Sequence, residues 1–288
     1  MIVTKGARFR PWKFSPVCSK NYRIKKTEGI WRHDKMKIEN EKNKTLYIQI
    51  SSALLRTVVR IIGGLKAETA KLCITPTRIN IIAFDNAMVA MMFLTLEQSI
   101  FEKFQAAQFE IDVDLNRLKE IVNLARTDDL ITIKFDYKNN QLVINLGNLE
   151  TRMGILDFNE GLNAPPSLLN QSGQIVLHVD ELKRGIAAAE FVAESVSLSI
   201  DPEKFELKAE DNANSAHLTL SKKDLVEHES NAIHKNTFST YHLSNIINVL
   251  NGEYCIRLCF GNGTHLQLDY DFSEKGHLTY VLMPRVES

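Results

Sequence analysis

The sequence predicts an α+β fold built from two similar domains, because one pattern of residues occurs twice. The sequence AFDNA at residues 83–87 recurs as AEDNA at residues 209–213, and each copy leads into a Leu-Thr-Leu segment. A second pair keeps nearly the same spacing, with IVN at residues 121–123 and IIN at residues 246–248. Two copies of one helix-and-strand pattern predict two domains side by side, each adding an equivalent face to one larger surface.

Length and composition are those of an ordinary globular chain. It has 288 residues, of which 44% are hydrophobic, enough for two domain cores. No apolar run approaches the roughly 20 residues that a membrane-spanning helix needs. The four cysteines are too scattered for a disulfide framework, and the first residues lack the apolar segment of a signal peptide. We therefore expect a reducing, intracellular compartment.

The formal net charge of zero hides a basic leader, residues 1–44. Residues 1–35 hold ten basic and two acidic side chains, which leaves 25 basic and 33 acidic residues for the rest of the chain. Both tryptophans, Trp12 and Trp31, also lie in this leader. It is a nucleic-acid-binding tail, a targeting segment, or a stretch preceding a true start at Met36. We favour the third interpretation and expect the leader to be disordered or absent in the cell.

The first half, residues 45–156, predicts a strand, a helix and three strands, and then the same order again. Alternating apolar residues predict the first strand at residues 46–50. From Ser51 the apolar spacing becomes helical, and Gly63 and Gly64 end this helix. Asp114 is expected to cap a second helix at residues 115–126. The remaining strands are predicted at residues 70–74, 78–84, 88–96, 109–113, 130–135, 141–146 and 151–156.

The second half, residues 174–288, repeats this order after a connector. Residues 157–173 are rich in Asn, Gly, Pro and Ser, which is typical of an exposed connector. Helices are predicted at residues 180–193 and 243–250. Strands are predicted at residues 174–178, 196–200, 204–209, 216–220, near Thr237, and at 255–260, 266–271 and 278–282. Each helix has an apolar face and a polar face, so we expect a helix-lined surface backed by a sheet.

Catalytic motifs are absent from the sequence. Gly63-Gly64 lacks the Lys-Ser/Thr of a phosphate-binding loop, and no nucleophile-elbow or zinc-protease motif occurs. Cys255 and Cys259 have the spacing of one strand face, but no second Cys/His pair accompanies them. We expect no metal and no cofactor. An enzyme with an active site assembled from distant residues, on a duplicated α+β scaffold, stays the alternative from another class.

Several stretches together resemble one known family. They are the closing stretch from Gly276 to Glu287, residues 80–89 with 94–96, and residues 114–118 with 129–133. Over about residues 45–288 the chain resembles the sliding clamp of archaea and eukaryotes, proliferating cell nuclear antigen (PCNA). Met283 replaces the alanine usual in the family's closing tail.

The resemblance implies a function without catalysis. It implies two DNA-clamp domains per chain and a ring of three subunits around double-stranded DNA, with helices lining the hole and sheets outside. Such a ring is a processivity factor: it tethers DNA polymerase and other replication and repair enzymes to DNA. The implied partners are DNA polymerase, the clamp loader, flap endonuclease and ligase, each bound through a short peptide motif. The implied location is the nucleoid in an archaeal cytoplasm, or the nucleus in a eukaryote, with no membrane contact.

Basic residues recur on the polar helix faces of a body that is otherwise acidic. A positive lining attracts phosphates without reading bases. The fourth helix supplies only uncharged polar residues, so we expect a weak grip on DNA. The candidate DNA-facing residues are Arg56, Arg60, Lys119, Arg126 and Lys183.

A second candidate site is apolar, and the resemblance places it beneath the connector. Clients of the family insert a peptide there, anchored by an apolar residue and two aromatics. Met88 and Met283 have flexible side chains suited to different partners. Core packing is the competing interpretation, above all for Val89 and Leu282, and His265 stands where relatives often have proline. The candidate pocket residues are Phe84, Met88, Val89, Leu162 as connector anchor, His265, Leu282, Met283 and Pro284.

The subunit boundary is expected at the strands predicted at residues 151–156 and 216–220, with Met153 and Leu218 nearby. In a homotrimer these two strands would pair with each other. A subunit of a heterotrimeric or checkpoint clamp is the closest alternative, and the sequence leaves this choice open.

Overall fold

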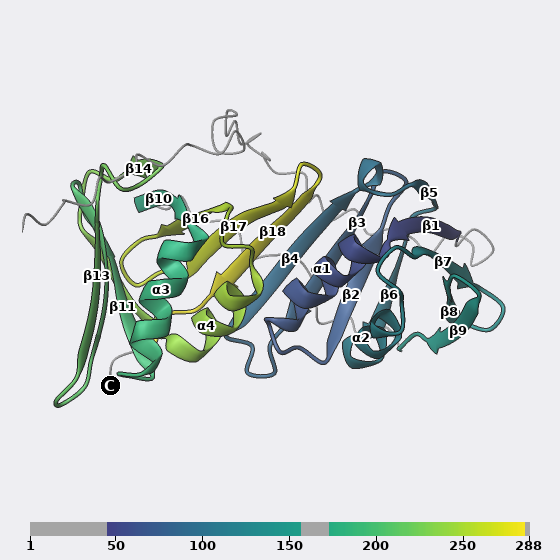
Figure 1. Cartoon of the computed structure of the whole chain (residues 1–288), viewed down its shortest axis with the longest axis horizontal. Helices are drawn as coiled ribbons and strands as arrows, with labels where there is room; N and C mark the ends of the chain where they lie inside the picture. Colours follow the sequence, from purple (N-terminus) through teal and green to yellow (C-terminus); the bar gives the residue numbers. More distant parts are fainter. Residues whose placement is uncertain (1–44, 157–172, 286–288) are drawn as a thin grey trace, which may run out of the picture. The chain divides into compact units, whose positions relative to one another are not determined.

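The computed structural model describes residues 45–156 and 173–285, which belong to one compact unit, Lys35–Ser288. The leader, most of the connector with Leu162, and residues 286–288 lie outside the described residues. Strands and helices follow the predicted α+β order (Figure 1).

The first half comprises β1 (Leu46–Ser51), α1 (Ser52–Gly63), β2 (Thr69–Ile74), β3 (Arg78–Phe84), β4 (Ala90–Glu97), the short 3-10 helix η2 (Gln98–Ile100), β5 (Lys103–Ala106), β6 (Phe109–Asp114), α2 (Leu115–Asn123), β7 (Leu130–Asp136), β8 (Gln141–Leu146) and β9 (Leu149–Gly154). The second half comprises β10 (Gly173–His178), α3 (Val179–Glu190), β11 (Ser195–Ile200), β12 (Lys204–Glu210), β13 (Ser215–Ser221), β14 (Glu227–Glu229), β15 (His234–Ser239), α4 (Thr240–Val249), β16 (Cys255–Phe260), β17 (Leu266–Ser273) and β18 (Gly276–Leu282).

One long sheet joins the two halves. Its strand order is β14-β10-β16-β17-β18-β4-β3-β2-β6. The joint is the antiparallel pair β18–β4, whose register runs from Gly276 opposite Leu96 to Leu282 opposite Ala90. Two smaller sheets, β5-β1-β7-β8-β9 and β13-β12-β11-β15, complete the described strands. In them β9 and β13 each have one edge without a partner strand.

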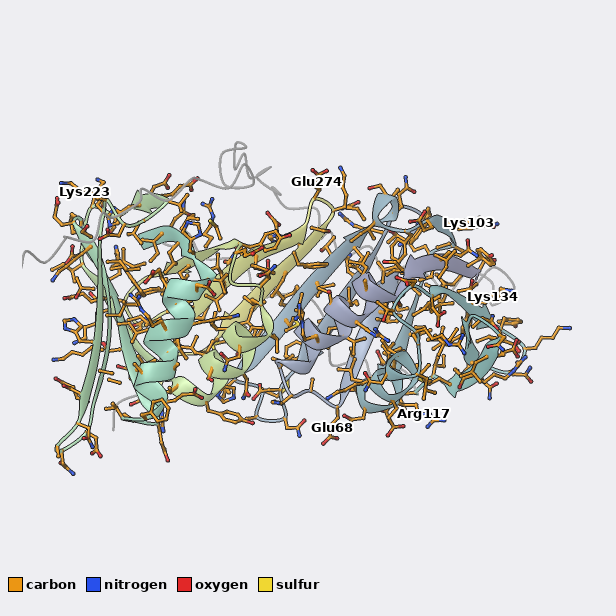
Figure 2. All side chains as sticks on the ribbon, in the orientation of Figure 1. Glu68, Lys103, Arg117, Lys134, Lys223 and Glu274 are labelled. Atoms are coloured by element: carbon orange, nitrogen blue, oxygen red, sulfur yellow. The ribbon has the colours of Figure 1, made fainter. Side chains whose placement is uncertain are left out.

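The four helices lie on one side of the long sheet (Figure 1). Their apolar faces pack against strands of both the long sheet and the smaller sheets, as α3 does against β10, β12 and β13. Side chains fill the space between helices and sheets (Figure 2). The halves also meet between α1 and α4. A Cβ on Gly64 would lie 2.8 Å from the Val249 side chain, so a larger residue at position 64 would force these helices apart.

Helix ends are where the prediction and the structure differ. The Asp114 cap is confirmed, because its carboxylate accepts the Arg117 N–H at 2.9 Å. However, α2 ends at Asn123, three residues before the predicted Arg126. The N–H groups of Leu124 and Ala125 bond three residues back, which tightens the last turn. Likewise α3 ends at Glu190 rather than residue 193, and α4 begins at Thr240 rather than residue 243. Strands β5 and β14 were not predicted.

We expect Asp114→Ala to lower the free energy of unfolding by about 1 kcal/mol, because the first turn of α2 loses its side-chain acceptor. Asp114→Asn keeps an acceptor at the same place and should cost far less. Chemical denaturation of both variants measures the difference. Equal losses would mean that the cap hydrogen bond contributes nothing to stability.

Candidate DNA interface and partner surface

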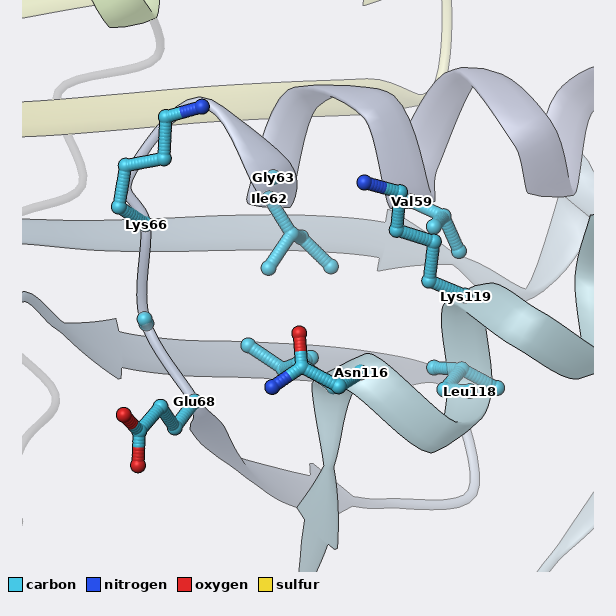
Figure 3. A pocket seen from close by; sticks show the side chains of 10 residues that line it. Val59, Ile62, Gly63, Lys66, Glu68, Asn116, Leu118 and Lys119 are labelled. Carbon is cyan, nitrogen blue, oxygen red and sulfur yellow. The ribbon is translucent and has the colours of Figure 1, made fainter.

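Basic side chains project from the helix side of the molecule. Arg60 on α1 and Lys119 on α2 are exposed, and so is Arg126 just beyond α2. A cavity of about 250 Å³ lies between the end of α1 and the start of α2. Lys66 and Lys119 border it, with Glu68 nearby (Figure 3). This part of the helix side presents mobile cations to solvent, which suits contact with phosphates.

Two of the five predicted DNA-facing residues are instead tied to neighbouring helices. Arg56 donates from Nη2 to the carbonyl of Ala125, just after α2. Lys183 donates from Nζ to the carbonyl of Leu250, which caps α4, at 2.8 Å. Each is the fifth residue of its helix, α1 and α3, so the repeat places both equivalently. A cation there satisfies helix-end carbonyls and the negative end of the helix dipole. Arg56 and Lys183 therefore hold helix pairs together.

Helix α4 adds no Lys, Arg, Asp or Glu side chain to this side. Ser244 is buried and accepts a hydrogen bond from the amide of Asn248 at 3.0 Å. His242 lies 3.3 Å from the carboxylate of Asp85, measured from Nε2, so it joins α4 to the turn between β3 and β4. Tyr241 is 59% exposed.

The turn after β3 presents Met88 to solvent. Met88 is 56% exposed and has a φ of 57°, in the left-handed region. The buried Asp85 carboxylate holds this turn, accepting the N–H groups of Val89 at 2.9 Å and Ala90 at 2.7 Å. The chain's closing segment runs beside it, because the Met283 N–H donates to the Val89 carbonyl at 2.9 Å. Met88 and Met283 thus come from the two halves of the chain to one surface.

Some of the other predicted pocket residues lie at the surface, and others are buried. Phe84, Val89 and Pro284 are half-buried beside the two methionines. His265 and Leu282 are buried, so neither belongs to the exposed surface. Burial lowers the pKa of His265, which keeps its ring neutral at pH 7. We call the surface made by Phe84, Met88, Val89, Met283 and Pro284 the partner groove.

The predicted boundary strands both end a sheet. The edge strand in the first half is β9, Leu149–Gly154, two residues before the predicted position. Met153 on it is buried in the core, so only its backbone is available at the edge. Leu218 on β13 is half-buried and packs near Gly185 of α3.

The part of the chain that the structure describes holds no metal cluster, and burial keeps its Cys73 and Cys259 thiols protonated. Burial raises the pKa of Cys259 to about 12, so its thiol stays protonated at neutral pH. No group of three His, Cys, Asp or Glu residues is placed to hold a metal among residues 45–156 and 173–285. In those same ranges no helix is long and apolar enough to cross a membrane.

Sequence reasoning missed the two backbone hydrogen bonds that the Asp85 carboxylate accepts, and the exposure of Tyr241 and Phe191. Asp85 lies in the repeated pattern at residues 83–87, which predicted the duplication but no role for this side chain. The available signal was its position directly after the strand predicted at residues 78–84 and shortly before Met88. Tyr241 lies in a turn that the helix prediction omitted, and Phe191 was placed inside the helix that in fact ends at Glu190.

Comparison with known proteins gives one consistent result. Residues 48–159 match the family model described as "Proliferating cell nuclear antigen, N-terminal domain". A DNA polymerase sliding clamp from Natronomonas pharaonis is 30% identical, over 72% of this chain and 85% of that protein. Another from Methanococcoides burtonii is 28% identical, over 83% of this chain and 98% of that protein.

Solved structures agree with the fold. The structure titled "C-terminal region of FEN-1 bound to A. fulgidus PCNA" has a TM-score of 0.78 at 23% identity, covering 84% of this chain and 99% of that one. PCNA from Thermococcus kodakaraensis has a TM-score of 0.76 at 24% identity, covering 83% of this chain and 100% of that one.

The two helix ties give a stability prediction. Arg56→Ala and Lys183→Ala should each lower the free energy of unfolding by about 1–2 kcal/mol, because each leaves helix-end carbonyls without their charged donor. Arg60→Ala, one turn further along α1, should change it by less than about 0.5 kcal/mol. Denaturant melts of the three variants decide this. If Arg60→Ala costs as much as Arg56→Ala, the ties do not stabilise the helix pairs.

Proposed function

The chain belongs to the family of DNA polymerase sliding clamps, and from that premise we propose that three copies close into a ring around duplex DNA. Its function is that of a DNA sliding clamp, which tethers DNA polymerase and other enzymes to their template. The observation that supports the ring is that β9 in the first half and β13 in the second each end a sheet, as β5 and β15 do at the opposite ends. Pairing β9 of one copy with β13 of the next would remove both edges and continue the sheets from copy to copy.

In this proposal residues 45–156 and 174–288 are two clamp domains, joined by the connector 157–173. The helices of all copies line the hole. Arg60, Lys119 and Arg126 neutralise DNA phosphates, whereas Arg56 and Lys183 act through the helices they hold. No base is read, so the ring moves along DNA without a sequence preference.

Partners bind on the partner groove. The relative from A. fulgidus is described in complex with the C-terminal region of FEN-1. By that likeness a flap endonuclease is a partner of this chain too, and polymerase, clamp loader and ligase dock through comparable peptides. The chain acts as a scaffold, not as an enzyme, and it works where chromosomal DNA is: the nucleoid of an archaeal cell, or the nucleus in a eukaryote.

DNA binding by the helix side predicts a change in salt dependence. Arg60→Ala with Lys119→Ala should weaken binding to duplex DNA, and the slope of log K against log salt should become less steep by roughly 1 for each phosphate that is no longer neutralised. Lys103→Ala is the matched control, because Lys103 projects from edge strand β5 and not from a helix (Figure 2). Fluorescence anisotropy at several salt concentrations measures the slopes. Identical slopes for the double variant and the parent would mean that Arg60 and Lys119 do not contact DNA phosphates.

Ring assembly predicts a homotrimer. At micromolar concentration, sedimentation should report three times the protomer mass of 32.7 kDa. A protein that stays at 32.7 kDa would contradict the homotrimer and favour a ring of different subunits.

Peptide binding predicts a strong effect at one exposed residue. Met88→Asp should cost about 2–4 kcal/mol of affinity for a peptide with the client motif, because it puts an unpaired charge in an apolar groove. Asp and Asn both tolerate the left-handed backbone at this position, so the turn should keep its shape. Met88→Asn is the control: similar in shape, uncharged, and expected to bind better than the Asp variant. Calorimetric titration that finds unchanged affinity for Met88→Asp would place the clients elsewhere.

A further inference from the structure

His242 is a mostly buried histidine that forms a hydrogen bond from the second half of the chain to the first. It is the third residue of α4, and its side chain is 21% exposed. Nε2 lies 3.3 Å from Oδ2 of Asp85, and because an ionised carboxylate only accepts, Nε2 is the donor. The other ring nitrogen, Nδ1, is buried and has no hydrogen-bond partner among the described residues. Within the described ranges, the hydrogen bonding of this ring is therefore directed at Asp85.

Asp85 is a buried carboxylate whose two oxygens have different partners. Oδ1 accepts the N–H groups of Val89 at 2.9 Å and Ala90 at 2.7 Å. Oδ2 faces His242, the one basic side chain that pairs with this carboxylate in the part of the chain that the structure describes. Burying a carboxylate is costly unless hydrogen bonds or an opposite charge replace the water it loses. His242 thus supplies a partner for the oxygen that the turn leaves unused.

The turn at residues 85–90 holds Met88 in a conformation that needs support. The φ of Met88 is 57°, in the left-handed region that a methionine rarely adopts. The Met88 N–H donates to the Asp85 carbonyl at 3.0 Å, and the Asp85 carboxylate holds the next two N–H groups. Rotation of the carboxylate about its Cβ–Cγ bond would break the bonds of Oδ1 and let the turn relax. The bond from His242 to Oδ2 opposes that rotation.

A general role in joining the two halves of the chain is the competing explanation. The halves are already joined along the whole register of β18 and β4, from Gly276 opposite Leu96 to Leu282 opposite Ala90. One further hydrogen bond adds little to a joint of that length. The bond from His242 is distinctive in that it reaches the side chain of Asp85 from outside the turn. Its loss should therefore be felt first at Met88.

We propose that His242 is a positioning residue of the partner groove. It holds the Asp85 carboxylate so that the turn presents Met88 in the conformation that an apolar anchor of a client peptide requires. This rests on the proposed function, because Met88 is assigned to peptide binding there. Helix α4 then contributes to peptide affinity without touching the peptide, since affinity scales with the fraction of molecules whose turn is in the binding conformation.

The first test uses the full-length protein, a peptide with the client motif, and calorimetric titration. His242→Leu should weaken binding about tenfold, the loss expected if the turn keeps its binding conformation in about a tenth of the molecules. His242→Gln and His242→Asn are a matched pair of amides. The Gln nitrogen takes about the place of Nε2 and reaches Asp85, whereas the Asn nitrogen takes only that of Nδ1. Gln should restore most of the affinity and Asn should not. Equal affinities for the two amide variants would overturn the proposal.

A double-mutant cycle tests whether His242 acts through Met88. In a Met88→Ala background, His242→Leu should weaken peptide binding by less than about twofold, because the side chain that it positions is already gone. Losses that simply add would mean that His242 acts on the peptide by another route, and would contradict the proposal.

Amide hydrogen exchange tests the turn without any peptide. The Val89 N–H, which donates to Asp85, should exchange faster in His242→Leu and His242→Asn than in the parent, and at the parent's rate in His242→Gln. Unchanged exchange in His242→Leu would show that the turn does not need this bond.

The outcomes separate this proposal from the groove on which it rests. If Met88→Asp weakens peptide binding and His242→Leu does not, the groove stands and the positioning role is wrong. If Met88→Asp leaves peptide binding intact, the groove itself is wrong. Faster exchange at Val89 would then show that His242 holds a turn that clients do not use.

Discussion

The antiparallel pairing of β18 with β4 is the interaction on which the rest of the structure depends. It joins strands from the two halves into one nine-stranded sheet, with Tyr280 and Met92 directly opposite each other and both buried. The four helices lie on one side of that sheet (Figure 1). The pairing also fixes the position of Met283, which follows β18 and donates to the carbonyl of Val89, so the partner groove depends on this pair of strands. The arrangement of the helix side and the position of the partner groove thus both depend on the pairing of β18 with β4.

The order of strands and helices could be predicted because it is encoded locally. Alternating apolar residues predicted β3, β8 and β16 with the bounds that the structure shows. Asp114, a residue type that caps helices, predicted the start of α2. Strands β5 and β14 escaped because each is short and exists by pairing with a distant strand: Phe104 lies opposite Ile48, and Glu229 opposite Gln174. The pocket could be predicted only as a set of residues from a resemblance. Which of them are exposed, such as Met88, and which are buried, such as Leu282, depends on packing between segments far apart in sequence.

The same limit applies to charge. On a helical wheel Arg56 and Arg60 are equivalent, and both point away from the apolar face. Only the position of the neighbouring helix shows that Arg56 reaches the carbonyl of Ala125, while Arg60 stays exposed. The repeat held a clue, because Lys183 occupies the matching place in α3 and makes the matching bond. With those two cations engaged, the helix side keeps few free ones. In the ring that we propose, closure holds the protein on DNA, so weak contacts are enough and leave it able to slide.

The claim that closure, rather than affinity, holds the protein on DNA is tested most directly by topology. The protein would be loaded by a clamp loader onto nicked circular DNA and washed at a salt concentration that abolishes its binding to linear duplex. The DNA would then be cut once while protein retention is followed. The account predicts that the clamp persists on the circle through the wash and leaves within the time needed to slide off the new ends. Loss from the uncut circle as fast as from linear DNA, or retention after the cut, would contradict it.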